Sequence, residues 1–216
     1  ALMSAVTETA HGHAPTEGAG VRMKGMDPAL MGIMLFIGSE VMFFAALFGS
    51  YFNVKATTKP FPQEGTEFIG WQGDLPFGLG LSVLITIVLV ISSFTMQWAT
   101  MRIRVGDRKG MTFGIGITLL LGIFFLCLQA CEYAHLIFDE NFTIGSSTYG
   151  TLFFTMTGFH GAHVIGGVIG LAVIFFRGLQ GQFSAEHHSA VEAVHYYWHF
   201  VDIVWIALFA TIYVLR

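Results

Sequence analysis

Five long apolar runs constrain the fold of this chain more than any other feature of its sequence. Each is longer than the roughly 20 residues that a helix needs to cross a hydrocarbon core about 30 Å thick. Only 11% of the residues are charged, whereas about a quarter would be charged in a typical soluble domain. The sequence therefore predicts an all-α, polytopic membrane protein, a five-helix bundle.

We expect one transmembrane domain over residues 29–216, preceded by a polar tail over residues 1–28 that we expect to be disordered. A loop rich in proline and glycine follows the first span. The five spans are predicted at about 29–52, 76–101, 111–135, 149–176 and 191–215.

The distribution of basic residues predicts the orientation of the bundle. Five spans place the two termini on opposite sides of the membrane, and the side of the amino terminus carries more Lys and Arg. The residues there are Arg22, Lys24, Arg102, Arg104, Arg108, Lys109 and Arg177, against Lys55, Lys59 and Arg216 on the other side. The positive-inside rule then predicts a cytoplasmic amino terminus and an outer carboxyl terminus. No basic arm suggests a nucleic-acid partner.

The last apolar run carries ionisable side chains. His195, His199 and Asp202 lie at i, i+4 and i+7, so a helix places all three on one face. An ionisable group near the centre of a lone inserted helix costs roughly 2.5–3.5 kcal/mol. This face is therefore expected to meet protein or water, and not lipid tails.

Two interpretations of this face are open. Together with His160 and His163 of the fourth span, it could ligate a metal ion or haem. Alternatively, these residues form a hydrogen-bonded polar seam between helices, in which Asp202 accepts from a histidine or from Trp198.

Glu40 lies within the first span and also has two interpretations. It could be a neutral carboxylic acid bonded inside the bundle, or a group that serves proton or ion movement. A small transporter is a weaker hypothesis, because transporters normally show two related halves with broken helices.

Two smaller features concern packing. Cys127 and Cys131 lie one helical turn apart and are predicted to be small buried thiols. The glycine pairs at residues 110 and 114 and at residues 166 and 170 are predicted to let helices approach closely within this chain.

Four sequence runs, in this order and spacing, resemble one family. They are GSEVMFF at 38–44, QACEY at 129–133, TGFHGAHVIGG at 157–167 and YYWHFVDIVW at 196–205, accompanied by GDRKG at 106–110 and HHSAVEA at 187–193. The chain resembles subunit III of the haem-copper terminal oxidases, such as cytochrome c oxidase, in a short five-helix form.

The resemblance implies an accessory, non-catalytic subunit of an oxidoreductase and translocase complex of aerobic respiration. Its expected partners are the catalytic subunit I and subunit II, which would carry haem and copper, together with phospholipids and a larger respiratory supercomplex. No cofactor is expected in this chain itself. The expected location is a bacterial plasma membrane, and proton translocation would be a property of the complex.

The resemblance also implies roles for single residues, none of them catalytic or metal-ligating. Glu40, Arg177 and His187 match positions of a lipid and oxygen path. A structural polar seam would contain Glu132, His160, His163, His195, His199 and Asp202. The long form of the family has two further spans that form one wall of a lipid cleft, so another chain would have to supply that wall.

Alternatives remain at this stage. The complex could be a quinol oxidase or a nitric oxide reductase, which the electron donor would reveal. A stand-alone haem or metal membrane protein built on the histidine faces would carry a chromophore or metal in the isolated chain.

Overall fold

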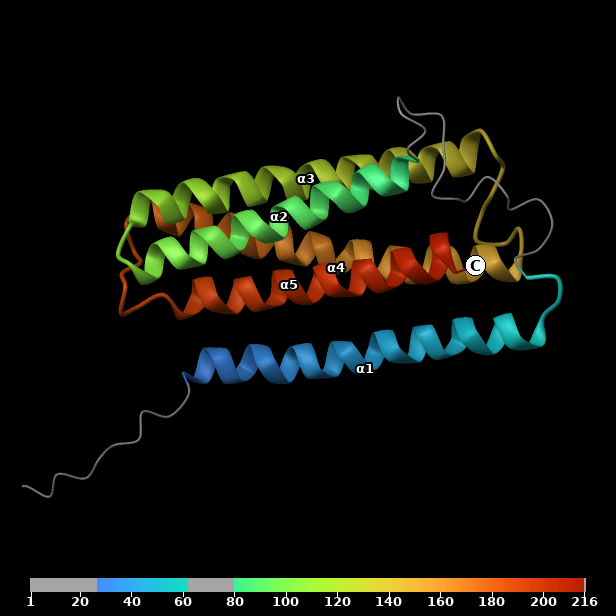
Figure 1. Cartoon of the computed structure of the whole chain (residues 1–216), viewed down its shortest axis with the longest axis horizontal. Coiled ribbons are helices and arrows are strands. Elements are labelled where there is room, and N and C mark those ends of the chain that lie inside the picture. Colours follow the sequence, from blue (N-terminus) through green and yellow to red (C-terminus); the bar gives the residue numbers. More distant parts are fainter. Residues whose placement is uncertain (1–26, 62–79, 216) are drawn as a thin grey trace, which may run out of the picture.

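The computed structural model describes residues 27–61 and 80–215, and these residues fold into antiparallel helices without any strand. The helices are α1 (Pro28–Thr57), α2 (Leu81–Arg104), α3 (Arg108–Phe138), α4 (Thr148–Leu179) and α5 (Ser189–Phe209), and a π-helical turn, η1 (Ala210–Val214), continues α5. Figure 1 shows that each helix runs in the opposite direction to its predecessor, and that α5 lies between α1 and α2.

All five helices are long and apolar enough to cross a membrane, with mean hydropathies of 1.5 to 2.4 in their most apolar windows. The predicted all-α, five-span architecture is confirmed. The start of α1 and the end of η1 lie at opposite ends of the bundle (Figure 1). Which end faces the cytoplasm stays a prediction.

The helix ends differ from the predicted spans in places. Asp27 caps α1, since its Oδ1 accepts a hydrogen bond from the backbone N–H of Ala29 at 2.9 Å, and Pro28 suits the first helical position. The helix then continues to Thr57, so the predicted loop beginning at Asn53 starts later. The start predicted at residue 76 lies outside the described residues, as does the tail up to residue 26.

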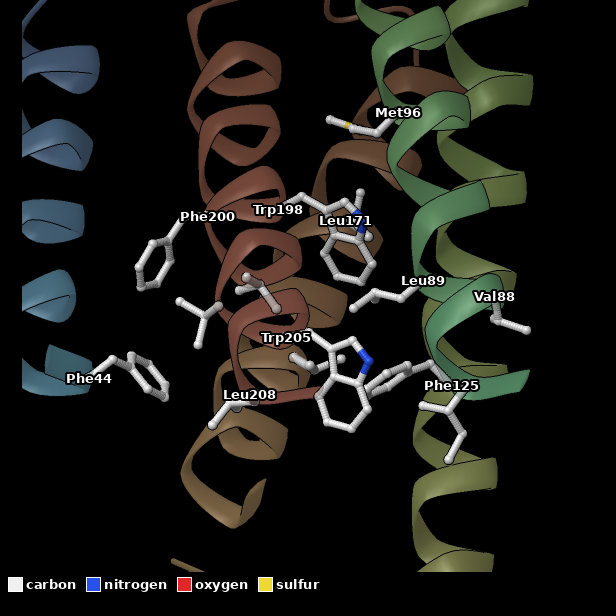
Figure 2. Close-up of a cluster of buried hydrophobic side chains, with 14 of the residues drawn as sticks. Phe44, Val88, Leu89, Met96, Phe125, Leu171, Trp198, Phe200, Trp205 and Leu208 are labelled. Carbon is white, nitrogen blue, oxygen red and sulfur yellow. The ribbon is translucent and has the colours of Figure 1, made fainter. Parts of the chain in front are cut away.

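The core is built around α5. Figure 2 shows Trp198 and Trp205 pointing from α5 towards α2 and α3, while Phe200 points towards Phe44 of α1. Both tryptophans are fully buried. Large indoles in the middle of a bundle need small neighbours on the facing helices, and glycines of α3 and α4 provide them.

Helix α1 lies at the edge of this bundle and packs mainly against α5, with a smaller contact to α4. Only 6% of its most apolar window is buried, against 56% for Ser189–Val214. Apolar residues such as Leu35 and Met42 are therefore exposed on α1. A surface of this kind suits lipid or another membrane protein and not water.

The glycine pairs take part in packing within the chain. A Cβ built on Gly114 would lie 2.8 Å from Cβ of Ala99, so α2 and α3 need a glycine there. Gly166 and Gly170 face Tyr197 and Val194 of α5.

The prediction of buried thiols was wrong, because Cys127 and Cys131 are both exposed. They lie on the outer face of α3. In a membrane bundle apolar residues cover the outside as well as the inside, so an apolar run does not show which face is buried.

Candidate functional site

A ladder of polar contacts joins α2 to α5 along most of their length. Near one end the Arg104 guanidinium donates to Glu192 Oε1 at 3.0 Å. Further contacts follow towards the other end, where the indole N–H of Trp205 donates to Thr86 Oγ1 at 3.0 Å. The contacts between them join His195 Nδ1 to Thr100 Oγ1 at 3.2 Å, His199 Nδ1 to Ser93 Oγ at 2.7 Å and Trp198 Nε1 to Ser92 Oγ at 3.0 Å.

The predicted shared face of α5 is present. The rings of His195 and His199 lie 4.4 Å apart between centroids, and Asp202 Oδ2 lies 3.6 Å from His199 Nδ1. That distance is too long for a hydrogen bond but within ion-pair range, and neither oxygen of the buried Asp202 carboxyl has a hydrogen-bond partner among the described residues. His199 Nδ1 and the Trp198 indole instead bond to Ser93 and Ser92 of α2, so the described residues show no hydrogen bond from either of them to Asp202.

Glu40 of α1 pairs with His163 of α4, with 3.0 Å between Oε2 and Nε2. Both side chains are largely buried. Aromatic rings surround the pair, since Phe44 and Phe200 lie 5.0 and 6.4 Å from the imidazole. Tyr197 of α5 donates its hydroxyl to the His163 carbonyl at 3.0 Å. Three helices therefore meet at His163.

The contact of the other ring nitrogen of His163 determines how many protons the Glu40–His163 pair holds. Nδ1 lies 2.7 Å from the carbonyl oxygen of Phe159, and a carbonyl can only accept, so Nδ1 carries a proton. A hydrogen bond between Nε2 and Glu40 then requires one more proton, on either the imidazole or the carboxyl. The pair is an imidazolium with a carboxylate or a neutral imidazole with a carboxylic acid.

His160 has a different environment, although it lies only one turn before His163. Its ring is buried and tilted against Trp205 at 5.0 Å and Phe125 at 6.0 Å. Neither ring nitrogen has a hydrogen-bond partner among the described residues. His160 therefore meets the aromatic core, whereas His163 meets α1.

The predicted histidines are thus divided among three places: the α2–α5 ladder, the contact with α1 and the aromatic core. Within residues 27–61 and 80–215 no group of three His, Cys, Asp or Glu side chains is arranged to hold a metal ion.

Glu132 of α3 belongs to a separate polar cluster near the other end of the bundle. Its two carboxyl oxygens accept from the hydroxyl of Tyr213 at 3.1 Å and from the amide of Gln129 at 3.3 Å. The Oε1 atom of the Gln129 amide has no partner among the described residues.

Arg177 and His187 lie at the end of the bundle where α4 stops and α5 begins. The Arg177 guanidinium donates to Gln182 Oε1 at 2.8 Å and stacks over Phe183 at 5.1 Å, and His187 is exposed. Arg177 follows His163 on α4 by roughly 21 Å at 1.5 Å per residue. The predicted lipid and oxygen residues are therefore separated in depth, with Glu40 far from both Arg177 and His187.

Prediction from sequence missed the partners on α2 and η1. Ser92 and Ser93, two adjacent hydroxyl residues inside the apolar run of α2, bind Trp198 and His199. These two serines could have indicated a contact with another helix, because polar residues within membrane helices often bond to a neighbouring helix. No comparable signal marked Tyr213.

Comparison with known proteins decides the family. The family model described as cytochrome c oxidase subunit III matches residues 9–216. The chain belongs to the cytochrome c oxidase subunit III family. A probable cytochrome c oxidase subunit 3 of Nocardia farcinica is 44% identical over 86% of this chain and 87% of its own length. The corresponding proteins of Mycobacterium leprae and Bos taurus are each 42% identical, covering 86% and 84% of this chain and 87% and 67% of theirs.

Membership of the cytochrome c oxidase subunit III family confirms the resemblance carried by the four motifs. With its five spans, the chain is a multi-pass bacterial membrane protein and a subunit of an oxidoreductase complex of respiration.

Proposed function

We propose that this chain is an accessory subunit of a proton-pumping terminal oxidase that carries no redox centre of its own and stabilises the catalytic subunit. One observation supports this most directly. The ring nitrogens of His163, His195 and His199 contact side chains on other helices, so these histidines hold the bundle together. Haem and copper would then reside in the partner subunits I and II.

We further propose that Glu40 lies beside a route for oxygen along bound lipid. Oxygen is apolar and dissolves better in hydrocarbon than in water, so a lipid-covered apolar face would concentrate it. Exposed Phe36 and Met42 lie on α1 around Glu40, and a phospholipid headgroup near Arg177 and His187 would extend its acyl chains towards this depth. The Glu40–His163 contact would hold α1 in place.

The first experiment is a reduced-minus-oxidised visible spectrum of the tagged complex, recorded before and after the partner subunits are stripped off. Haem absorbance is expected to leave with a larger partner. Haem or stoichiometric metal that remains on the isolated chain would instead indicate a site at the histidine faces, with His160 as the first residue to test. The electron donor that the intact complex oxidises separates a cytochrome c oxidase from a quinol oxidase.

The second experiment tests Glu40. Glu40→Ala is expected to leave the haem spectrum intact while shortening the active lifetime of the complex or raising its apparent oxygen requirement. Exposed Ser50 of the same helix, whose hydroxyl donates to the Ala46 carbonyl of its own helix, offers the control Ser50→Ala. Wild-type oxygen dependence and lifetime in Glu40→Ala would remove Glu40 from the path.

A further inference from the structure

A groove runs along the outer face of the bundle between α3 and α4, away from α1. It consists of two cavities of about 510 and 310 Å³. Phe113 and Phe175 line both cavities, so the two are adjacent. The first has a polar mouth formed by Arg108, Lys109 and Thr112. The second is lined only by apolar residues and glycine, ending at Leu120.

Close helix packing shapes the floor of this groove. A Cβ built on Gly116 would lie 3.0 Å from the Phe175 ring, and one on Gly178 would lie 2.9 Å from Thr112 Oγ1. The two helices therefore touch along the floor. Phe113 and Leu120, with 64% and 68% of their surfaces exposed, form one rim.

The two cations at the mouth are available to a ligand. Arg108 and Lys109 are exposed, and the ion pairs among the described residues involve neither of them. The adjacent carboxylate of Asp107 is engaged by Arg102 and by the Gly110 N–H. Glu186 has a pKa that is lowered mainly by backbone and Ser184 hydrogen bonds and only slightly by the charge of Arg108. Its carboxylate does not approach Arg108 within ion-pair distance.

We propose that this groove binds an anionic phospholipid. Its phosphate would lie between Arg108 and Lys109, with the Thr112 hydroxyl as a further donor, because basic residues at headgroup depth attract anionic lipids. One acyl chain would follow Phe113 and Phe175 towards Leu120. From Arg108 to Leu120 the helix rises roughly 18 Å at 1.5 Å per residue, comparable with one leaflet of a hydrocarbon core about 30 Å thick.

This site is distinct from the proposed lipid and oxygen path. That path runs from Arg177 and His187 to Glu40 on α1, whereas the groove lies between α3 and α4, and neither Arg177 nor His187 is among its lining residues. The proposal of a lipid site in the groove can therefore be wrong while that of the lipid and oxygen path is right, and the reverse.

Lipid retention tests the headgroup contact. The intact oxidase is purified with the double variant Arg108→Gln/Lys109→Gln, and phospholipids that remain bound are quantified by mass spectrometry. The double variant is expected to retain about one anionic phospholipid fewer per complex, with phosphatidylethanolamine unchanged. Arg102→Gln removes one positive charge at the same end of the bundle but outside the groove. This control variant should retain as much anionic phospholipid as the wild type. Equal anionic lipid in all three preparations would overturn the proposal.

Photo-crosslinking tests the occupant of the apolar part. A photoreactive phenylalanine analogue replaces Leu120 in one variant and Phe94, an exposed residue of α2, in another. After irradiation in native membranes, the Leu120 adducts are expected to be richer in anionic phospholipid than the Phe94 adducts. Adducts of identical composition at both positions, or a crosslink from position 120 to another protein chain, would overturn the assignment.

Discussion

The indole of Trp198 occupies a slot between two glycines on different helices. A Cβ built on Gly122 of α3 would lie 2.8 Å from Cη2 of the ring, and one on Gly167 of α4 would lie 2.8 Å from Cε3 and Cζ3. On its third side the indole N–H is bonded to Ser92. Residues of α2, α3 and α4 contact the ring on three sides, so it has little room to move if one of the glycines gains a side chain.

Gly167→Ala is therefore expected to destabilise the bundle by about 1–3 kcal/mol, the usual effect of overpacking a close-packed core. Gly161 is the matched control, since it lies on the same helix and a Cβ there meets nothing within 4 Å. Gly161→Ala should be neutral or slightly stabilising, because alanine favours a helix. Thermal denaturation of the purified subunit in detergent measures both, and equal melting temperatures would contradict the confinement of Trp198.

At the scale of single residues, the sequence predicted contacts within one helix better than contacts between helices. The shared face of His195, His199 and Asp202 follows from helical periodicity alone. The pairing of Glu40 with His163 depends on the rotation of two helices that are not neighbours in the chain. No periodicity in either span contains that information, which is also why the separate surroundings of His160 were not predicted.

The α2–α5 ladder shows how two antiparallel helices are held in register. Polar contacts occur from Arg104 with Glu192 at one end to Thr86 with Trp205 at the other. In lipid the hydrophobic effect does not distinguish the inside of a bundle from the outside, so packing and such bonds must fix the register.

A double-mutant cycle with Ser93→Ala and His199→Leu measures one step of this ladder. The coupling energy is expected to be about 0.6 kcal/mol, and at most about 1.7, as for other hydrogen bonds between membrane helices. The control cycle pairs His199→Leu with Thr86→Ala, because Thr86 bonds to Trp205 instead. Those two changes should add within about 0.5 kcal/mol. Zero coupling in the first cycle would mean that this contact does not fix the register.

The start of α1 is joined to the start of α5 by a carboxylate. Asp27 Oδ2 accepts from the Ser189 hydroxyl at 2.5 Å. This bond and the cap to Ala29 hold the pKa of Asp27 below its ordinary value of 3.8. Since both bonds favour the charged form, their stabilisation is complete above pH 3.8 and is lost as the pH falls through the lowered pKa.

Ser189→Ala is therefore expected to raise the pKa of Asp27 towards 3.8, whereas Ser189→Thr, which keeps the hydroxyl, should leave it low. The chemical shift of the Asp27 carboxyl carbon, followed by NMR as a function of pH, measures the change. An identical titration midpoint in the two variants would show that the Ser189 contact does not stabilise the carboxylate.

At the scale of the whole molecule, the described residues form a compact group of four helices with α1 attached to its edge. The described contacts of α1 with the rest include Glu40 with His163, Tyr51 with the Thr211 carbonyl, and Lys55 with the Leu215 carbonyl. These bonds add to the apolar packing of Phe44 and of partly buried residues such as Phe43 and Leu47 against the core.

In the isolated subunit α1 is thus expected to exchange its amide hydrogens before α5, because regions with few buried contacts open first. Hydrogen exchange with mass spectrometry in detergent measures this order. The His163→Asn variant should accelerate exchange in α1 and leave α3 unchanged. Simultaneous exchange of α1 and α5 would indicate that the bundle opens as one unit.

The number of spans was predictable because length and apolarity alone decide whether a helix can cross a bilayer. The order of the helices around the bundle was not predictable, since every span is apolar on its outer face as well. The exposure of Cys127 and Cys131 follows from the same ambiguity. Only polar residues distinguish the faces of a membrane helix, and α1 has few of them.

The contacts of the π-helical turn η1 bear on the order in which the helices can pack during synthesis. Helix ends leave carbonyls without partners, and here the carbonyls of Thr211 and Ile212 accept from Tyr51 of α1 and Tyr149 of α4. Helix α1 therefore finds its main neighbour, α5, only after three intervening helices have been translated. Until α4 has been made and brings His163, Glu40 lies in the membrane without its partner, where lipid, water or an assembly factor would have to accommodate the carboxyl.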